Sequence, residues 1–151
     1  MDISIVIPLY NESESIIPLG EEIASVCQGN NFKTEVIFVN DGSTDQSWFK
    51  INEMVKREYH DVFFRGINFR KNLGKSNALN EGFKYVLGDV VITMDADLQD
   101  NPIEIPKFVD LIIKKKFDLV SGWKKNRKDP ISKTIPTKLF NSVTRFFSGI
   151  Q

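Results

Sequence analysis

The sequence predicts an α/β fold in which a mostly parallel, Rossmann-like sheet is flanked by helices. Short apolar segments rich in β-branched residues alternate with segments of helical periodicity along nearly the whole chain, as in βαβ units. The apolar segments contain few polar residues, which is typical of parallel strands buried on both faces. With 151 residues, of which 41% are hydrophobic, the chain can bury one core. We therefore expect one domain that spans residues 1–151.

Strands and helices are expected in alternation along this domain. The expected strands cover residues 3–9, 35–40, 62–68, 89–94 and 117–121. The expected helices cover residues 13–28, 44–59, 75–87 and 103–115, followed by an amphipathic helix at 136–148. N-cap chemistry for the second helix comes from Ser43, Thr44 and Asp45, and for the fourth from Asn101 with Pro102.

The charges of the chain are unevenly distributed although the net charge is zero. Residues 1–106 contain 9 Lys/Arg and 17 Asp/Glu, a balance of −8, whereas residues 107–151 contain 11 and 3, a balance of +8. This basic last third is either a solvated helix face with a basic loop or a surface that meets anionic phosphate or an anionic membrane. The charge pattern alone leaves both interpretations open.

The sequence shows neither a membrane span nor a signal peptide. No segment approaches the ~18 continuous apolar residues of a transmembrane helix, and the first residues lack the pattern of a cleaved leader. We therefore expect the chain to fold in the cytosol. Its one cysteine, Cys27, has no partner for an internal disulfide and no metal-ligand spacing around it, so a buried structural thiol is expected.

Two carboxylates one residue apart, Asp95 and Asp97, follow the apolar segment at residues 90–94. They would lie at the carboxyl end of a buried strand, which is where open α/β sheets bind ligands. Neighbouring carboxylates repel each other, and a hard cation such as Mg²⁺ or Mn²⁺ removes that penalty while keeping positions open for phosphates. The acidic pair therefore predicts a site for a metal-bound diphosphate.

Polar residues follow each of the first four expected strands, at the ends that would share one edge of the sheet. They are Tyr10, Asn11 and Glu12, then Asn40 to Ser43, then Arg70 to Asn72, and then Asp95 to Asp100. Taken alone, the segment 41–43 is also an ordinary turn and Asn11 an ordinary cap. The convergence of all four on one edge favours a ligand site.

These residues closely resemble, in order and spacing, the inverting glycosyltransferases of family 2. The segments that carry the resemblance are 5–12, 39–45, 70–75 and 95–102. Within the family the sequence is most similar to the polyprenyl- and dolichyl-phosphate sugar transferases, such as dolichol-phosphate mannose synthases, because of Leu98 and Gln99 and the segment 122–127. The resemblance covers the whole chain and implies the GT-A nucleotide-sugar-binding fold.

The resemblance also implies roles for individual residues. Nucleotide contacts are implied for Pro8, Tyr10, Asn11, Glu12, Asp41, Arg70, Lys75 and Asp95, with Asp41 reading the base edge. A Mg²⁺ or Mn²⁺ ion is implied at Asp95, Asp97 and Gln99, and catalytic roles at Asp95, Asp97 and Arg127. Family members often carry Asp where this chain has Asn40; we expect base binding to survive this change because Asp41 is retained.

The implied acceptor is a polyprenyl phosphate, bound by Lys125, Arg127, Lys133 and Lys138. A phosphate monoester has its second pKa near ~6 and is largely ionised at neutral pH, so its transfer needs little or no general base. The expected partners are a nucleotide-sugar donor and the membrane surface, at its cytoplasmic face, without nucleic acid; an oligomer is compatible with the sequence. Two alternatives stay open: a saccharide hydroxyl as acceptor, and a non-catalytic nucleotide and Mg²⁺-binding module.

Three other classes fit the sequence poorly. A haloacid-dehalogenase phosphatase predicts Asp-X-Asp-Gly-Thr on an early strand, and a receiver domain predicts an aspartate after the third strand, where Arg70 and Lys71 stand. A dinucleotide-binding domain needs G-x-G-x-x-G after the first strand, which is missing. Relatives of the polyprenyl-phosphate subfamily continue past the point that matches Gln151, so the chain is expected to be an N-terminal fragment able to bind donor.

Overall fold

The computed structural model describes residues 1–122, and its first compact unit comprises Met1–Val120. The elements of this unit are β1 (Ile3–Leu9), α1 (Ile16–Gly29), β2 (Thr34–Asn40), α2 (Ser47–Val55), β3 (Val62–Asn68), α3 (Lys75–Phe83), β4 (Val90–Thr93), a 3₁₀ turn (Pro102–Glu104) and α4 (Ile105–Ile113). None of the helices in this described part is long and apolar enough to cross a membrane.

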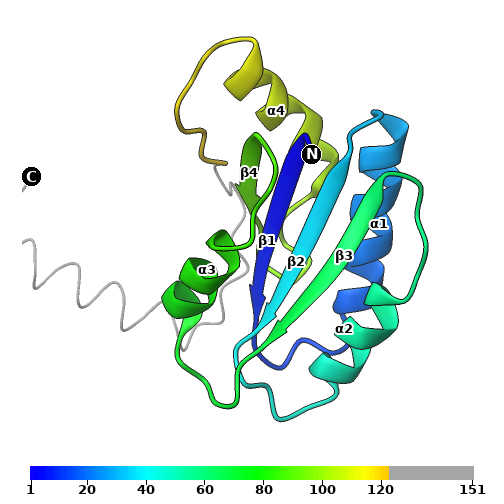
Figure 1. Ribbon diagram of the computed structural model, residues 1–151, viewed down its shortest axis with the longest axis vertical. Helices are drawn as coiled ribbons and strands as arrows, with labels where there is room; N and C mark the ends of the chain where they lie inside the picture. The colour runs from blue at the N-terminus through cyan, green and yellow to red at the C-terminus, as the bar shows by residue number, and fades with distance from the viewer. Residues whose placement is uncertain (123–151) are drawn as a thin grey trace, which may run out of the picture. The chain divides into compact units, whose positions relative to one another are not determined.

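The four strands form one parallel sheet in the order β3-β2-β1-β4 (Figure 1). Leu9 at the end of β1 lies opposite Asn40 of β2, and Asn40 in turn lies opposite Asn68 of β3. Every position of β1 and β2 is buried, whereas β4 alternates between buried and exposed positions and β3 does so only in its first half. The two central strands are thus covered on both faces, as their continuous apolar sequences predict.

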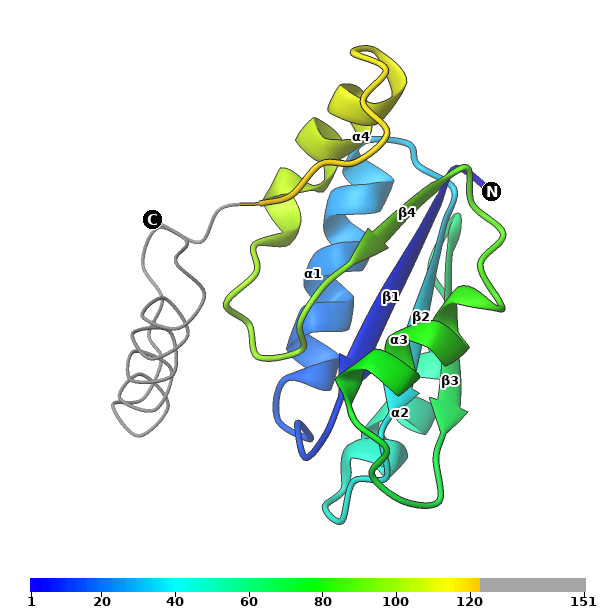
Figure 2. The same cartoon turned by 90° about the vertical axis from the view of Figure 1, so that its left-hand side faces the viewer.

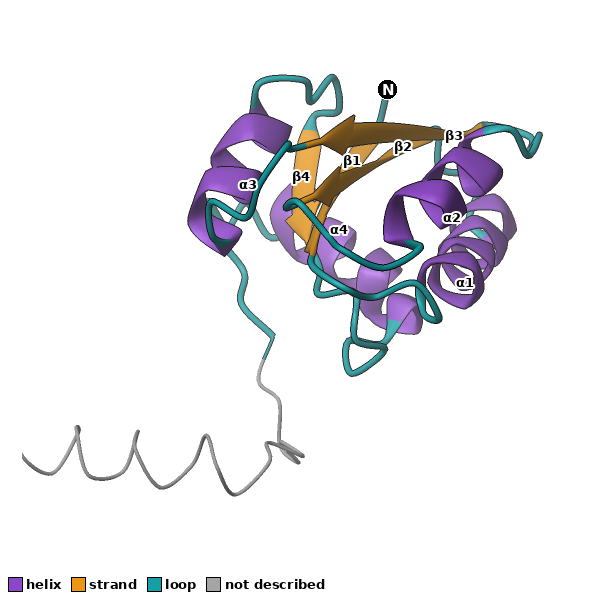
Figure 3. Cartoon of the chain, turned by 90° about the horizontal axis from the view of Figure 1, so that it is seen from below, coloured by secondary structure: helices purple, strands orange, loops and turns teal. Residues whose placement is uncertain are grey.

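Helices cover the two faces of the sheet unequally, with α1, α2 and α4 on one face and α3 on the other (Figures 1 and 3). The larger core cluster includes Ile5 and Phe38 of the sheet with Leu19 of α1. Val6 points to the opposite face and packs with Ala78 of α3 in a smaller cluster. Successive residues of a strand face opposite sides, so one strand contributes to both clusters.

Helix α3 packs against the sheet through a glycine. A Cβ on Gly82 would lie 2.4 Å from Cγ1 of Val6, so a larger residue could not occupy this position without displacing the helix. This contact sets the distance between α3 and β1. The N-terminal end of α3 lies at the carboxyl edge of the sheet (Figure 2).

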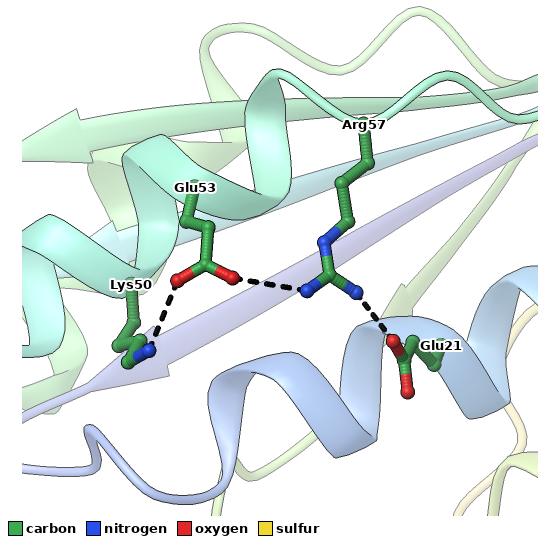
Figure 4. Close-up of polar contacts among 4 residues, drawn as sticks. All are labelled: Glu21, Lys50, Glu53 and Arg57. Carbon is green, nitrogen blue, oxygen red and sulfur yellow. Dashed lines mark hydrogen bonds and ion pairs between the residues drawn. The ribbon is translucent and has the colours of Figure 1, made fainter.

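The outer surfaces of α1 and α2 are joined by a network of ion pairs (Figure 4). Arg57, just after α2, pairs with Glu53 at 3.0 Å and with Glu21 of α1, and Lys50 pairs with Glu53 at 2.9 Å. Partly exposed pairs of this kind each contribute little, and a shared arginine that connects two helices adds geometric definition. The network lies on the helices of the larger core cluster.

The first four expected strands and the first four expected helices are confirmed, with shorter helices than the sequence predicts. Helix α3 ends at Phe83 rather than 87 because the chain must leave it before Gly88. A Cβ on Gly88 would lie 2.5 Å from the carbonyl carbon of Ile3, so the segment before β4 crosses directly over the backbone of β1. Ser4 Oγ fixes this crossing by accepting a hydrogen bond from the Gly88 amide at 2.8 Å.

The prediction of a strand at residues 117–121 is wrong. Lys116 has a φ of 59°, which turns the chain out of α4, and the following residues are irregular, with Leu119 86% exposed. An apolar segment becomes a strand only when it finds an edge to pair with, and here it pairs with none of the described strands. The expected helix at 136–148 lies outside the described residues.

Candidate functional site

The carboxyl ends of the strands bring together the polar loops that the sequence places after them. In Figure 1 the ends of β1, β2 and β3 are the arrowheads at the lower edge of the sheet. The loop after β1 contains Glu12, the loop after β2 contains Asp41, and the loop after β4 contains Asp95 and Asp97. Lys75 reaches the same region as the first residue of α3. The expected convergence is therefore confirmed for these loops.

The loops after β1 and β2 are joined by reciprocal hydrogen bonds. The amide of Asn11 donates to Ser43 Oγ at 2.9 Å, and the side-chain oxygen of Asn11 accepts from the amide of Thr44 at 2.8 Å. The amide of Glu12 donates to Ser47 Oγ at 2.9 Å. Asn11 has a φ of 58°, a conformation that asparagine tolerates better than most residues. These bonds fix the backbone that carries Glu12.

The start of α2 differs from the N-cap expected at residues 43–45. The helix begins at Ser47, and Asp45 bonds the Ser47 amide through Oδ1 at 2.9 Å. The other carboxylate oxygen of Asp45 accepts from the amide of Ser13 at 3.1 Å. Burial would raise the pKa of Asp45, but its hydrogen bonds with Ser47 and Ser13 outweigh burial and lower it. Asp45 therefore acts as a second link between the two loops, which the sequence did not indicate.

Asp41 anchors the loop that precedes α3. Its side chain is buried, and Oδ1 accepts a hydrogen bond from the amide of Leu73 at 2.7 Å while Oδ2 accepts one from Gly74 at 2.9 Å. Gly42 has a φ of +69°, and a Cβ there would lie 2.3 Å from the carbonyl carbon of Lys71. The anchored loop thus packs directly on the backbone of Gly42, which only glycine permits.

Asn40 fits a neutral network at the end of β2. Its amide nitrogen donates to the side-chain oxygen of Asn68 at 2.7 Å, and its oxygen accepts from the amide of Ser43 at 3.3 Å and from the Ser43 hydroxyl. An aspartate at this position would lack the donor for Asn68 and would add a second negative charge beside Asp41. The departure from the family pattern at residue 40 is therefore matched by its surroundings.

The acidic loop after β4 is shaped by its own side chains. The amide of Asp95 donates to Asp100 Oδ2 at 2.9 Å, and the amide of Gln99 donates to Asp97 Oδ1 at 3.1 Å. Asn101 then caps the 3₁₀ turn by accepting from the amide of Ile103 at 3.0 Å. The cap expected at Asn101 therefore forms on the 3₁₀ turn that leads into α4, whereas the N-cap position of α4 itself is Glu104. Lys75 of α3 forms an ion pair with Asp95, which links the third and fourth βα units.

The carboxylates of the loops after β1 and β4 lie near enough to interact electrostatically. Burial raises the pKa of Glu12, the charge of Asp97 raises it further, and a hydrogen bond from Ser15 only partly opposes this. Two carboxylates separated by more than eighty positions therefore influence each other at the edge of the sheet. A cation placed there would relieve their repulsion.

The donor set at this edge fits a hard divalent cation. Asp95, Asp97 and Gln99 offer only oxygen as ligand atoms, which suits Mg²⁺ or Mn²⁺ better than softer metals. No group of three His, Cys, Asp or Glu side chains within residues 1–122 is arranged to hold a metal ion by itself. A cation bound here would complete its coordination with water and with phosphate oxygens of a ligand, as Mg²⁺ sites commonly do.

The remaining expected site residues have different surroundings. Pro8 is buried within β1, Tyr10 is exposed after it, and Arg70 lies in the loop that Asp41 anchors. The expected acceptor residues Lys125, Arg127, Lys133 and Lys138 lie outside the described residues, so the catalytic role of Arg127 stays a prediction. Ser47 and Asn68 also support the site, although the sequence indicates no role for them there; Ser47, the first residue of α2, accepts from the amide of Glu12, and Asn68 accepts from Asn40.

The sheet, its helices and the acidic loop after β4 define an α/β domain of the GT-A type. The chain belongs to glycosyltransferase family 2, because the family described as "Glycosyl transferase family 2" matches residues 4–150. The match covers nearly the whole chain, including every loop of the site described above.

Two curated relatives are similar over the whole chain. The dodecaprenyl-phosphate galacturonate synthase of Rhizobium johnstonii is 33% identical over 152 residues, covering 100% of this chain and 44% of the relative. The undecaprenyl-phosphate 4-deoxy-4-formamido-L-arabinose transferase of Pseudomonas syringae is 36% identical over 148 residues, covering 98% and 43%. The chain thus spans less than half the length of the curated relatives it matches.

A solved structure confirms the fold class. The mannosyltransferase PcManGT from Pyrobaculum calidifontis, in complex with GDP-Man and Mn²⁺, matches with a TM-score of 0.59 at 24% identity. The match covers 74% of this chain and 32% of that protein. At this level of identity the likeness establishes the shared fold.

Proposed function

We propose that the protein containing this chain transfers a sugar, with inversion, from a UDP- or GDP-sugar to a polyprenyl phosphate, using Mg²⁺ or Mn²⁺. The observation that carries the proposal is the edge of the sheet where Asp95 and Asp97 lie with Lys75. An acidic pair for a cation and an ammonium group for a phosphate are the two features that a nucleotide diphosphate requires.

The donor half of the proposal assigns a task to each loop. Asp95, Asp97 and Gln99 would hold the cation, which when bound supplies Lewis-acid stabilisation of the charge that develops on the leaving diphosphate. Lys75 and Arg70 would bind the phosphates and Asp41 the base, from a position already fixed by its bonds to the loop before α3. Pro8, Tyr10, Asn11 and Glu12 would line the nucleotide.

Two further observations support the use of a divalent metal ion. PcManGT, which shares the fold, was solved with GDP-Man and Mn²⁺. Burial raises the pKa of Glu12 and the charge of Asp97 raises it further, which indicates that carboxylates from two loops lie near enough to repel each other at this edge. Both observations favour a divalent cation as part of the donor complex.

The acceptor half rests on the relatives and on charge. Both curated relatives are named for polyprenyl phosphates, dodecaprenyl in one and undecaprenyl in the other. The last third of this chain has a balance of +8, which suits a phosphate dianion at an anionic membrane surface. We assign the acceptor phosphate to Lys125, Arg127, Lys133 and Lys138, and the reaction to the cytoplasmic face of the membrane.

A transfer assay tests this function. UDP- and GDP-sugars carrying a labelled sugar are incubated with the protein, Mn²⁺ and a polyprenyl phosphate, and label is measured in the organic extract. We expect labelled lipid with one nucleotide class, lost in Asp97→Ala and retained in Asp110→Asn, a matched acid-to-neutral control on α4. Label in a water-soluble saccharide, with none in lipid, would contradict the proposed acceptor.

A further inference from the structure

Lys75 and Asp95 form an ion pair that bridges α3 and the loop after β4. The two residues are 20 positions apart, and both side chains are partly exposed, 59% for Lys75 and 36% for Asp95. Asp95 is also one of the two carboxylates that we assign to the divalent cation. The structure therefore places an ammonium group of the chain itself on a carboxylate that a metal would need.

The backbone at both ends of this ion pair is fixed. Asp41 holds the amides of Leu73 and Gly74 directly before Lys75, and the amide of Ala78 bonds the Gly74 carbonyl at 3.2 Å to start the helix. Asp95 is held through its amide by Asp100. Breaking the pair therefore needs only rotation of side chains, and the four-carbon chain of Lys75 is long and flexible enough to reach another anion nearby.

The pair also balances charge at a crowded edge. Asp97 and Asp100 lie with Asp95 in the loop after β4, and Glu12, in the loop after β1, experiences the charge of Asp97. Within the part of the chain that the structure describes, Lys75 forms an ion pair with this group through Asp95. An ammonium and a divalent metal ion would repel each other if both sat on Asp95, because like charges a few ångströms apart interact strongly.

We propose that Lys75 is an internal counter-ion that occupies Asp95 until the donor binds, and then transfers to the donor diphosphate and releases Asp95 to the metal. This inference rests on the proposed function, because it assumes a metal and a nucleotide diphosphate at this edge. Without nucleotide, the metal binds weakly, because it must displace Lys75 from Asp95 while no diphosphate is present to pair with the lysine. Nucleotide and metal bind cooperatively, because each removes an obstacle for the other.

The proposal predicts that removal of Lys75 strengthens the binding of metal in the absence of nucleotide. Removal of Lys75 should tighten the binding of Mn²⁺ alone by about three- to tenfold, because an exposed ion pair is modest in strength and the competing like charge is lost. The same change should weaken nucleotide binding in the presence of Mn²⁺, because the diphosphate loses its ammonium partner. A residue that only binds phosphate would show the second effect without the first.

The experiment titrates Mn²⁺ into the chain without nucleotide and follows the electron paramagnetic resonance signal of free Mn²⁺. The variants are Lys75→Gln, Lys75→Met, Lys75→Arg and Lys84→Gln. Lys84 follows the last residue of the same helix and pairs with Glu81, so its substitution changes net charge equally, away from the acidic loop. Near-ultraviolet circular dichroism confirms that each variant is folded, and the titrations are repeated with saturating UDP or GDP.

We expect Lys75→Gln and Lys75→Met to bind Mn²⁺ alone more tightly than both the wild type and Lys84→Gln, and Lys75→Arg to resemble the wild type. We also expect the enhancement of Mn²⁺ affinity by nucleotide to shrink in the first two variants. Equal Mn²⁺ affinity of Lys75→Gln and Lys84→Gln, with normal metal-dependent nucleotide binding by the wild type, overturns this inference and leaves the proposed function intact. Failure of every variant and the wild type to bind Mn²⁺ with nucleotide overturns both.

Discussion

The carboxylate of Asp41 holds the amide of Gly74, with 2.9 Å between Oδ2 and the amide nitrogen. This bond joins the end of β2 to the residue that precedes α3, and a parallel bond to the neighbouring amide uses the other oxygen of the carboxylate. It is the contact that sets where Lys75 begins its helix. The geometry of the proposed donor site therefore depends on a buried bond that holds a loop in place.

Removing the Asp41 carboxylate should destabilise the protein. Asp41→Ala removes the buried carboxylate that accepts hydrogen bonds from the amides of Leu73 and Gly74. We therefore expect a loss of about 2–3 kcal/mol in the free energy of unfolding, measured in urea. Hydrogen exchange at those two amides should accelerate more than at the amides of β1. The exposed Asp118 provides the control, since Asp118→Ala should change neither quantity. Unchanged exchange at residues 73 and 74 would contradict this role.

Gly42 should tolerate no side chain. Its φ of +69° and the 2.3 Å approach of a Cβ to the backbone of Lys71 together predict that Gly42→Ala costs more than about 2 kcal/mol of stability. Gly29, at the end of α1, has nothing within 4 Å of its Cβ position, so Gly29→Ala should stabilise by about 0.5–1 kcal/mol through helix propensity. Thermal melts of the two variants should therefore shift in opposite directions. A similar melting temperature for both would refute the close packing described for Gly42.

Ser4 should stabilise the crossing before β4. Its hydroxyl donates to the buried Glu35 at 2.6 Å and accepts from the amide of Gly88 at 2.8 Å. Ser4→Ala removes these two bonds and a third from the amide of Leu87 at 3.1 Å, and we expect a loss of about 1–3 kcal/mol in the free energy of unfolding. Ser76→Ala, at an exposed position of α3, is the control. Equal stability of the two variants would show that the buried bonds of Ser4 contribute nothing.

Glu12 should make stability depend on pH. Burial and the charge of Asp97 raise its pKa in the folded protein above the ordinary value of 4.5, so folding disfavours its charged form. The contribution of Glu12 to stability is therefore fully present at pH values below its pKa in the unfolded protein. It is lost as the pH rises through its pKa in the folded protein. Without added metal, Glu12→Gln should be the more stable protein at neutral pH, and this advantage should disappear below about pH 4 in urea titrations. A constant difference between the two proteins at all pH values would contradict the assigned cause.

The acceptor residues can be separated from the donor site by kinetics. Neutralising Arg127 and Lys133 should raise the KM for polyprenyl phosphate severalfold or abolish transfer, because a phosphate dianion loses cationic partners, and should leave nucleotide binding intact. Lys107→Gln, which removes a lysine that pairs with Glu104 near the start of α4, is the charge-matched control. Equal loss of nucleotide binding in the Arg127 and Lys133 variants would count against their assignment to the acceptor.

The sequence predicted the four strands of the sheet to within one residue at each end because their signals are local. Apolar, β-branched runs such as Val90–Thr93 and the polar residues that follow them indicate both the strand and its carboxyl end. The order of strands then brings Asp41 and Asp95 to one edge, as expected of a parallel sheet.

The contacts within the site could not be predicted in the same way. The bonds from Asp41 to Gly74 and from Asn40 to Asn68 join residues that are 33 and 28 positions apart, and they exist only once β2 and β3 are neighbours. The strand expected at 117–121 failed for a related reason, because the sequence shows that a segment is apolar but gives no information about whether an edge receives it.

The central claim is that the edge carrying Asp95 and Asp97 binds a nucleotide diphosphate through a divalent cation. Isothermal titration calorimetry of UDP and GDP into this chain, with and without Mn²⁺, tests it most directly. We predict that one of the nucleotides binds with Mn²⁺ present, that binding disappears when Mn²⁺ is removed, and that Asp97→Ala abolishes it while Asp110→Asn does not. Nucleotide binding that is indifferent to Mn²⁺, or no binding of either nucleotide, would contradict the claim.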